Sequence, residues 1–259
     1  MCGPTVPPAG TAVASLDDCV SAEWPVAPWV RAFTTVRGGG SSRHPFDSFN
    51  LAGHVGDDPH AVARNRERLR TALRLPAEPA WLKQVHGTQV VHATQVHKDA
   101  TADGSYVDRP GLVCAVLTAD CLPVFLCDAA GTRVAVLHAG WRGLSAGIIE
   151  RGIHAMARAP QDLVAWLGPA IGPTAFEVGP EVREALAGDD AEARALFTDA
   201  REDRLLADLC GLARLRLRRA GVTEVYGGGL CTVTDPARFY SYRRDGACGR
   251  MASLIWLER

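Results

Sequence analysis

Three short polar segments interrupt apolar stretches of this 259-residue chain, and each contains a side chain that can bind a transition metal. The segments read KQVHG, TADCLP and HAGWRG, and they supply His86, Cys121 and His138. Imidazole and thiolate together favour zinc or copper over magnesium or calcium. Three protein ligands leave a fourth coordination position for substrate, which is typical of a catalytic zinc site. We therefore expect zinc here, with copper as a possible competitor.

The spacing of these residues does not by itself require a metal. Separations of 35 and 17 residues match no local zinc motif such as HExxH. A single histidine beside an apolar strand is more often a hydrogen-bonded core residue, and a buried cysteine is usually inert. From spacing alone, both interpretations stay open.

The elements that must position these side chains follow from the apolar pattern. Strands are expected at 29–35, 81–86, 89–93, 112–117, 124–127, 133–138, 163–167, 222–226, 239–242 and 251–257. Helices are expected from Asp58 as N-cap with Pro59 at N1, then over 144–157, 180–198 and 203–220, the last ended by Gly221. This alternation predicts an α/β or α+β fold, with mixed β-sheet layers flanked by helices.

Composition limits the classes of function. Residues 1–28 are rich in proline and alanine and are expected to form a weakly ordered tail, with one catalytic domain over 29–259. The net charge of −1 and the absence of basic blocks argue against a nucleic-acid partner. No apolar run reaches the ~20 residues that a membrane helix needs, and no signal peptide is visible. Eight cysteines without a CxxC pair indicate free thiols, so we expect a cytoplasmic protein, monomeric or homodimeric.

Seven segments in order resemble one known family. They read FTTVRGGGSS, PFDSFNLAGHVGDDP, WLKQVHG, TADCLPV, HAGWRGL, GPAIGPTAFEVG and FYSYRRDGACGRMASLI. Together they resemble the laccase-domain purine nucleoside phosphorylases, also called the polyphenol oxidase or peptidoglycan editing factor family. The resemblance covers about residues 30–257. It implies a fold like that of the cytotoxic-necrotizing-factor deamidating toxin domains.

The resemblance also implies a site and an activity. The family's zinc ligands fall on His86, Cys121 and His138, which would also be the catalytic residues. It implies phosphorolysis of adenosine, inosine and methylthioadenosine, together with adenosine deaminase activity. Purine nucleoside and phosphate would then be the partners. One departure is that Val36 stands where the family usually has arginine, so Arg37 would have to replace it in substrate binding.

Other side chains are candidates for substrate binding. Arg142, Arg243 and Arg244 could hold phosphate, because guanidinium matches phosphate bidentately. Asn50 and His54 lie on an irregular segment and could bind ribose or transfer a proton. Gln84, two residues before His86, is expected to point to the same face of the strand over 81–86. Asp120 could orient Cys121, its neighbour.

A rival interpretation needs no metal. Cys121 would be a nucleophile and His138 its base, in a hydrolase that removes a wrong amino acid from a peptidoglycan precursor. That mechanism leaves His86 without a role, whereas a zinc site requires it. A multicopper laccase is not expected, because such oxidases use His-x-His pairs and this chain has none.

Overall fold

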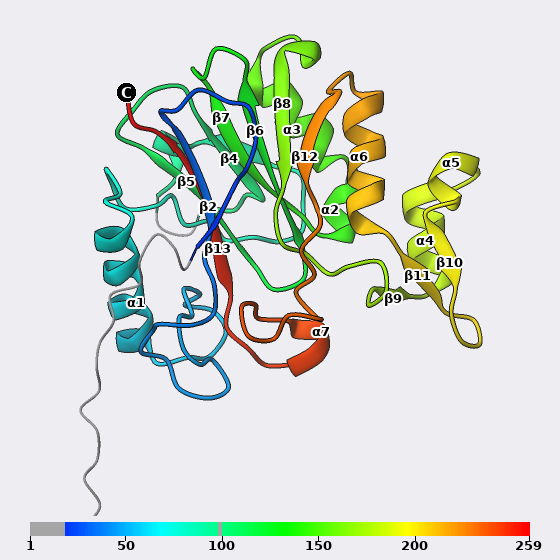
Figure 1. Cartoon of the computed structure of the whole chain (residues 1–259), viewed down its shortest axis with the longest axis horizontal. Coiled ribbons are helices and arrows are strands. Elements are labelled where there is room, and N and C mark those ends of the chain that lie inside the picture. Colours follow the sequence, from blue (N-terminus) through cyan, green and yellow to red (C-terminus); the bar gives the residue numbers. More distant parts are fainter. Residues whose placement is uncertain (1–18, 98–99) are drawn as a thin grey trace, which may run out of the picture.

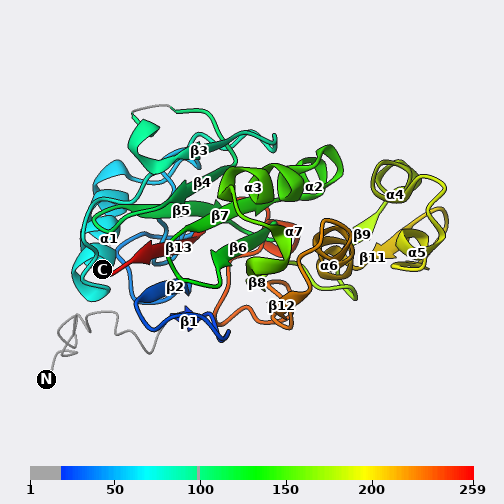
Figure 2. The same ribbon diagram turned by 90° about the horizontal axis from the view of Figure 1, so that it is seen from above.

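Two β-sheets pack face to face at the centre of the protein (Figures 1 and 2). The computed structural model describes residues 19–97 and 100–259. The larger sheet has the order β12-β8-β6-β7-β4-β3, and the smaller has the order β1-β2-β13-β5. The larger sheet contains β3 (Val90–His92), β4 (Gly104–Val107), β6 (Leu122–Asp128), β7 (Val134–Ala139), β8 (Leu163–Leu167) and β12 (Glu224–Gly227). The smaller contains β1 (Val20–Ser21), β2 (Val30–Thr34), β5 (Val113–Thr118) and β13 (Met251–Leu257).

Alternation along the strands explains how both sheets are buried on two faces. In β6, Phe125 and Cys127 face the core between the sheets, whereas Val124 and Leu126 face the helices. Successive strand residues point to opposite faces, so a sheet covered on both sides needs apolar residues at every position. This is why β5, β6, β7 and β13 are continuous apolar runs that are buried throughout.

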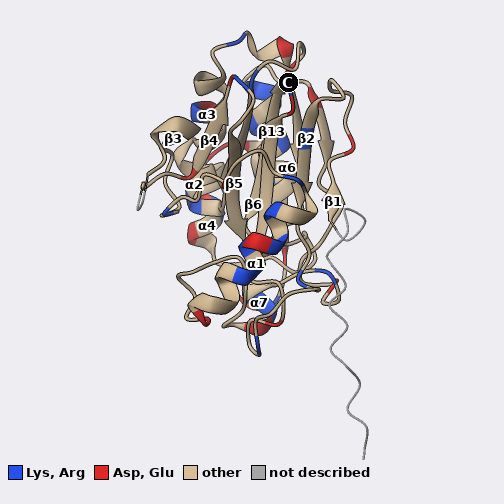
Figure 3. Cartoon of the chain, turned by 90° about the vertical axis from the view of Figure 1, so that its left-hand side faces the viewer, with Lys and Arg blue, Asp and Glu red and all other residues tan. Residues whose placement is uncertain are grey.

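Helices form the two outer layers. The helices α2 (Trp141–Ala146), α3 (Ile148–Met156) and α6 (Leu209–Arg219) cover the larger sheet, and α1 (Pro59–Ala72) covers the smaller (Figures 1 and 3). On α1, basic and acidic positions lie next to one another on the outer side (Figure 3). The prediction of mixed sheets flanked by helices is confirmed.

A small projection extends beyond α6 (Figure 1). It contains the antiparallel strands β9 (Glu177–Val178), β10 (Phe197–Asp199) and β11 (Leu205–Ala207), with α4 (Pro180–Ala187) and α5 (Ala191–Arg194). The remaining elements are α7 (Tyr242–Asp245) and the 3-10 turns η2 (Ala93–Gln95) and η3 (Pro160–Asp162).

The structure confirms the expected start of α1 and the expected end of α6. Asp58 caps α1 by accepting a hydrogen bond from the backbone N–H of His60 at 2.9 Å, and Pro59 is the first helical residue. Gly221 follows α6 with φ of 94°, a left-handed conformation that glycine adopts without strain. Of the expected tail, residues 1–18 lie outside the described residues, and Val20–Ser21 form β1.

Other expected elements are wrong. Residues 81–86 form no strand, because the backbone N–H groups of Val85 and His86 bond to a carboxylate instead of a neighbouring strand. Residues 239–242 turn into α7, which Ser241 caps. The helix expected over 144–157 is broken by Gly147, at φ of 98°.

The two helices expected after residue 180 are shorter than predicted. The first breaks after α4 at Gly188, where φ is 47°, and α5 restarts behind the N-cap Asp190. The second begins only after Asp208, because residues 205–207 pair with their neighbours as β11. Strand β4 was not expected. None of the helices among the described residues is long and apolar enough to cross a membrane.

Candidate metal centre and its cavity

His86, Cys121 and His138 converge at one end of the central sheets. Their ligand atoms all lie within 4.8 Å of one another, and Cys121 Sγ is 3.8 Å from His86 Nε2. His86 lies in the loop before β3, Cys121 in the turn between β5 and β6, and His138 near the end of β7. Within residues 19–97 and 100–259 this is the one such group of three or more potential ligands.

The turn that carries Cys121 is held by Asp120. This residue has φ of 87°, and its carboxylate accepts hydrogen bonds from Thr232 Oγ1 at 2.6 Å and from the Arg243 N–H at 2.7 Å. The conformation is unfavourable for a non-glycine residue, so these bonds are needed to stabilise it. Asp120 therefore orients Cys121 through the backbone rather than through direct contact with the cluster.

A buried carboxylate that sequence reasoning missed holds both histidines. Asp103 is fully buried and accepts a hydrogen bond from His138 Nδ1 at 2.8 Å. It also accepts from the backbone N–H groups of Val85, His86 and Gly87, at 3.2, 2.9 and 2.7 Å. These bonds keep the 85–87 loop in place, including His86 with its φ of 59°. The sequence offered little signal for this role, because the strand that follows Asp103 reads GSYV and has no clear apolar pattern.

Hydrogen bonding sets the orientation of His138. Because Nδ1 is bonded to Asp103, Nε2 is the nitrogen left for the cluster, an arrangement common among metal-binding histidines. Burial alone would raise the pKa of Asp103, but the bonds from His138 and from the backbone lower it. The carboxylate is therefore ionised at neutral pH and acts only as an acceptor.

The two histidines change the chemistry of the Cys121 thiol. Burial would raise its pKa, but the charge and hydrogen bonding of His138, followed by His86, lower it to about 6. For His138 the signs are reversed: burial alone would lower its pKa, but the Cys121 thiolate and Asp103 raise it. The cluster thus favours a thiolate, the form that binds metals and attacks electrophiles.

The donor set fits a tetrahedral metal ion. Tetrahedral bonds of about 2.0 Å to nitrogen and 2.3 Å to sulfur place ligand atoms roughly 3.3 to 3.5 Å apart. The 3.8 Å between Cys121 Sγ and His86 Nε2 is close to that range. Copper accepts the same donors, so the geometry does not discriminate between the two metals.

The cluster opens into a cavity of about 480 Å³, a size typical of small-molecule sites. Four of the predicted substrate-binding residues line it: His54, Gln84, Arg142 and Arg243. Its wall also includes residues that sequence reasoning had not singled out, namely Arg250, Trp141, Phe176 and Tyr242. The segment FYSYRRDGACGRMASLI had already contained two of these, Tyr242 and Arg250.

Three other predicted residues do not line this cavity. Arg37 bonds to the Asp47 side chain and lies over the Tyr240 ring. Asn50 is fully buried, and its amide oxygen accepts hydrogen bonds from the backbone of Ala52 and Arg250.

Arg244 is occupied by structural bonds. Its guanidinium donates to the carbonyl oxygens of Thr232, Val233 and Phe239, and it pairs with Asp245. These contacts connect α7 to the preceding loop and leave Arg244 outside the cavity wall.

Gln84 lines the cavity, but not for the reason expected. Since 81–86 is not a strand, its position does not follow from a face shared with His86. Its amide instead makes two bonds to Leu117 of β5, donating to the carbonyl at 2.9 Å and accepting from the N–H at 2.7 Å. Gln84 is therefore a fixed part of the wall.

The sequence matches a known family and named relatives. Residues 31–258 match the family described as multi-copper polyphenol oxidoreductase laccase, and the chain belongs to this family. It is 53% identical to the Pseudomonas aeruginosa purine nucleoside phosphorylase PA4543, over 91% of this chain and 97% of that protein. It is 52% identical to the Escherichia coli purine nucleoside phosphorylase YfiH, with the same coverage.

Solved structures show the same fold. The Neisseria meningitidis protein NMB0706 superposes with a TM-score of 0.90 at 48% identity, covering 93% of this chain and all of that one. YlmD from Geobacillus stearothermophilus gives 0.83 at 31% identity, covering 91% and 94%. The family predicted from the seven segments is confirmed.

Proposed function

We propose that the protein is a metal-dependent purine nucleoside phosphorylase, with zinc bound by His86, Cys121 and His138. The observation that carries the proposal is the convergence of these side chains on a cavity lined by three arginines, Arg142, Arg243 and Arg250. The names of the relatives support the substrate class. Adenosine, inosine and methylthioadenosine are the proposed substrates.

Phosphorolysis breaks the bond between C1′ and the base and forms a bond from C1′ to a phosphate oxygen. The base leaves with the electron pair and gains a proton, so the products are purine and ribose 1-phosphate. The three arginines offset the charge of the incoming phosphate. None of them has an ion-pair partner within the part of the chain that the structure describes, so their charge is available to an anion.

The cavity wall also suits a purine ring. Trp141, Phe176 and Tyr242 contribute aromatic surface, and Tyr242 is 61% exposed although it is a large apolar residue. Aromatic rings bind flat bases by stacking. His54, which also lines the cavity, is the candidate for binding the ribose.

A zinc ion in this cluster would supply a Lewis acid that polarises a substrate oxygen or activates water. The protein's contribution is the fixed donor set, with Asp103 holding His138 and the His86 loop. The proposed adenosine deaminase activity uses the same cluster: water adds at C6 of adenine, and ammonia leaves.

The test is a product analysis. Zinc-loaded protein is incubated with adenosine, with and without phosphate, and the products are separated by chromatography. The proposal expects adenine only with phosphate, and inosine also without it, both lost in Cys121→Ala and kept in Cys127→Ala. If neither product forms while one zinc is bound per chain, the proposal fails.

A second candidate is favoured by one observation. Cys121, His138 and Asp103 form a chain of thiol, imidazole and carboxylate, as in cysteine hydrolases. In that function the protein would need no metal. It would hydrolyse an amide bond, such as the one that joins a wrong amino acid to a peptidoglycan precursor. The discriminating variant is His86→Ala, which would abolish a zinc-dependent activity and spare a Cys/His hydrolase.

A further inference from the structure

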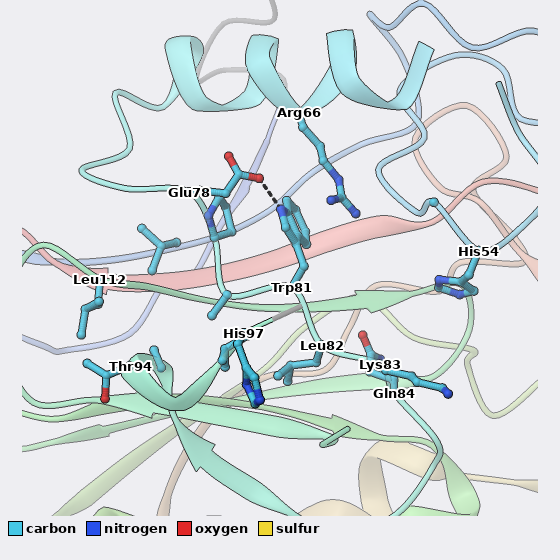
Figure 4. Close-up of a pocket in the computed structure, with 16 residues that line it drawn as sticks. His54, Arg66, Glu78, Trp81, Leu82, Lys83, Gln84, Thr94, His97 and Leu112 are labelled. Carbon is cyan, nitrogen blue, oxygen red and sulfur yellow. Dashed lines mark hydrogen bonds between the residues drawn. The ribbon is translucent and has the colours of Figure 1, made fainter. Parts of the chain in front are cut away.

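A larger cavity of about 1000 Å³ adjoins the metal centre's cavity and has no assigned role. The two share His54 and Gln84 in their walls. Figure 4 shows His54, Lys83 and Gln84 together at one end of the larger cavity, and Arg66 extending from α1 toward the Trp81 ring. Gln84 is fixed by its two bonds to Leu117, so the boundary between the cavities is a defined feature of the fold.

The wall of the larger cavity carries more positive than negative groups. Among the described residues that line it, Arg66 and Lys83 are cations and Glu78 is the one carboxylate. Glu78 already accepts a hydrogen bond from Trp81 Nε1. Among the described residues, neither Arg66 nor Lys83 has a carboxylate within ion-pair distance. Unpaired cations in a concave wall raise the local concentration of anions.

Arg66 is preorganised for binding. Its Nε and Nη2 donate to the carbonyl oxygen of Leu51 at 3.0 and 2.9 Å, and its guanidinium lies 4.2 Å from the centroid of the Trp81 ring. These contacts hold the side chain in one position and leave Nη1 available for an acceptor. Burial lowers the pKa of Arg66, and the charge of Glu78 on the same wall opposes this only in part.

Positive charge continues across the boundary between the cavities. Burial lowers the pKa of His54, and the charges of Arg250 and Arg66 lower it further. Arg250 belongs to the smaller cavity and Arg66 to the larger, so His54 has a cation on each side. A ligand with an anionic group at this boundary would be attracted from both cavities.

We propose that the larger cavity binds the phosphate groups of a phosphorylated ligand, through Arg66 and Lys83. An arginine and a flexible lysine suit the several acceptor oxygens of a phosphate or diphosphate. The anion can be free, or it can be the phosphate tail of a nucleoside whose base lies in the smaller cavity. Only the second source rests on the proposed function, and it extends the substrate class to nucleoside phosphates.

The experiment is calorimetric titration of zinc-loaded protein in phosphate-free buffer at low salt. Three ligands are compared: inosine, inosine 5′-diphosphate and inorganic pyrophosphate. Inosine cannot be deaminated, and without phosphate it undergoes no phosphorolysis, so binding is measured without turnover. Zinc content is determined before and after each titration, because diphosphates can extract metal.

The variants are Lys83→Gln and Arg66→Gln, with Arg64→Gln as matched control. Arg64 lies on the same helix, is exposed and does not line the cavity. Lys83 is exposed, so its variant should fold even if Arg66→Gln loses stability with its contacts to Leu51 and Trp81.

If the phosphate tail enters the larger cavity, inosine 5′-diphosphate binds about tenfold more tightly than inosine. Each cavity variant then reduces this affinity ratio at least about threefold. Inosine itself binds all variants equally. If pyrophosphate binding depends on Lys83 and Arg66 while the diphosphate has no advantage, the ligand is a free anion.

The proposal is overturned if neither phosphate ligand depends on Lys83 or Arg66. This outcome can be separated from a failure of the proposed function. If the protein carries out no phosphorolysis and does not bind inosine, the pyrophosphate titration still tests the larger cavity.

Discussion

Cys114 and Cys121 lie seven residues apart in the sequence but in opposite chemical environments. Cys114, within β5, is fully buried between the two sheets, and burial raises its pKa to about 12. Cys121 lies just beyond the same strand, where His138 and His86 outweigh burial and lower its pKa to about 6. Burial alone makes a thiol inert, and burial beside two imidazoles makes it a metal ligand or a nucleophile.

The core thiols also differ from Cys121 in what holds them. Cys127 faces the same intersheet core as Cys114, and burial raises its pKa to about 12 as well. These side chains pack against apolar neighbours, whereas the Cys121 turn is fixed by the polar contacts of Asp120. Four predictions test this contrast.

The largest expected effect is on alkylation of the metal-free protein. Since the thiolate is the reactive form, Cys121 should react with iodoacetamide at pH 7 at least about a thousandfold faster than Cys114 or Cys127. Its lowered pKa means that the rate falls as pH drops through about 6. Peptide mass spectrometry measures each rate, and added zinc should protect Cys121. Equal rates for the three thiols would contradict the contrast.

Removing the Cys121 ligand should abolish metal binding and activity. Cys121→Ala is expected to retain almost no zinc after dialysis and to lose at least about a hundredfold of any zinc-dependent activity. The matched variant Cys127→Ala should keep its zinc and lose only about 1 kcal/mol of stability through the small cavity it creates. Atomic absorption and thermal melting provide the two measurements. Full zinc retention in Cys121→Ala would remove this residue from the ligand set.

Replacing the Asp103 carboxylate, which bonds to His138 and to the His86 loop, should have a smaller effect on zinc binding. Asp103→Asn is expected to lower zinc affinity about 10- to 100-fold, because His138 loses its charged acceptor and the His86 loop loosens. Competition with a coloured chelator gives the affinity.

The control for Asp103 is Asp128, another buried carboxylate. It bonds to Thr132, Arg133 and Arg158, none of which belongs to the cluster. Asp128→Asn should cost about 1–3 kcal/mol of stability and leave zinc affinity unchanged. If both variants lose zinc equally, Asp103 acts on the fold and not on the ligands.

The smallest effect is expected from one added methyl group. A Cβ at Gly140 would lie 2.8 Å from Cys121 Sγ and 3.0 Å from His86 Cδ2. Gly140→Ala should therefore shift the ligands and reduce zinc affinity a few-fold to about tenfold. Gly38→Ala has no neighbour within 4 Å of the added Cβ and should leave the affinity unchanged. An unaffected Gly140→Ala would show that the cluster tolerates displacement.

Sequence signals predicted the strands of the two sheets other than β1 and β4, the start of α1 and the three residues of the cluster. Continuous apolar runs predict strands buried on both faces, and the Asp58-Pro59 pair predicts a helix start, because both signals are local. The three ligands were found through their polar segments and the family resemblance, since their spacing has no local period.

Other features depend on contacts between distant segments, which no local pattern contains. Asp103 is 17 residues from His86 and 35 from His138. The pairing of β4 with β7 brings it to His138, and the pairing of β3 with β4 brings it to the loop of His86. Its bonds turn residues 85–87 away from the expected strand. Likewise, the side chains of Arg244 and Asn50 make structural hydrogen bonds, whereas Arg250 lines the cavity. The partners of each polar group come from distant segments, so the sequence does not reveal them.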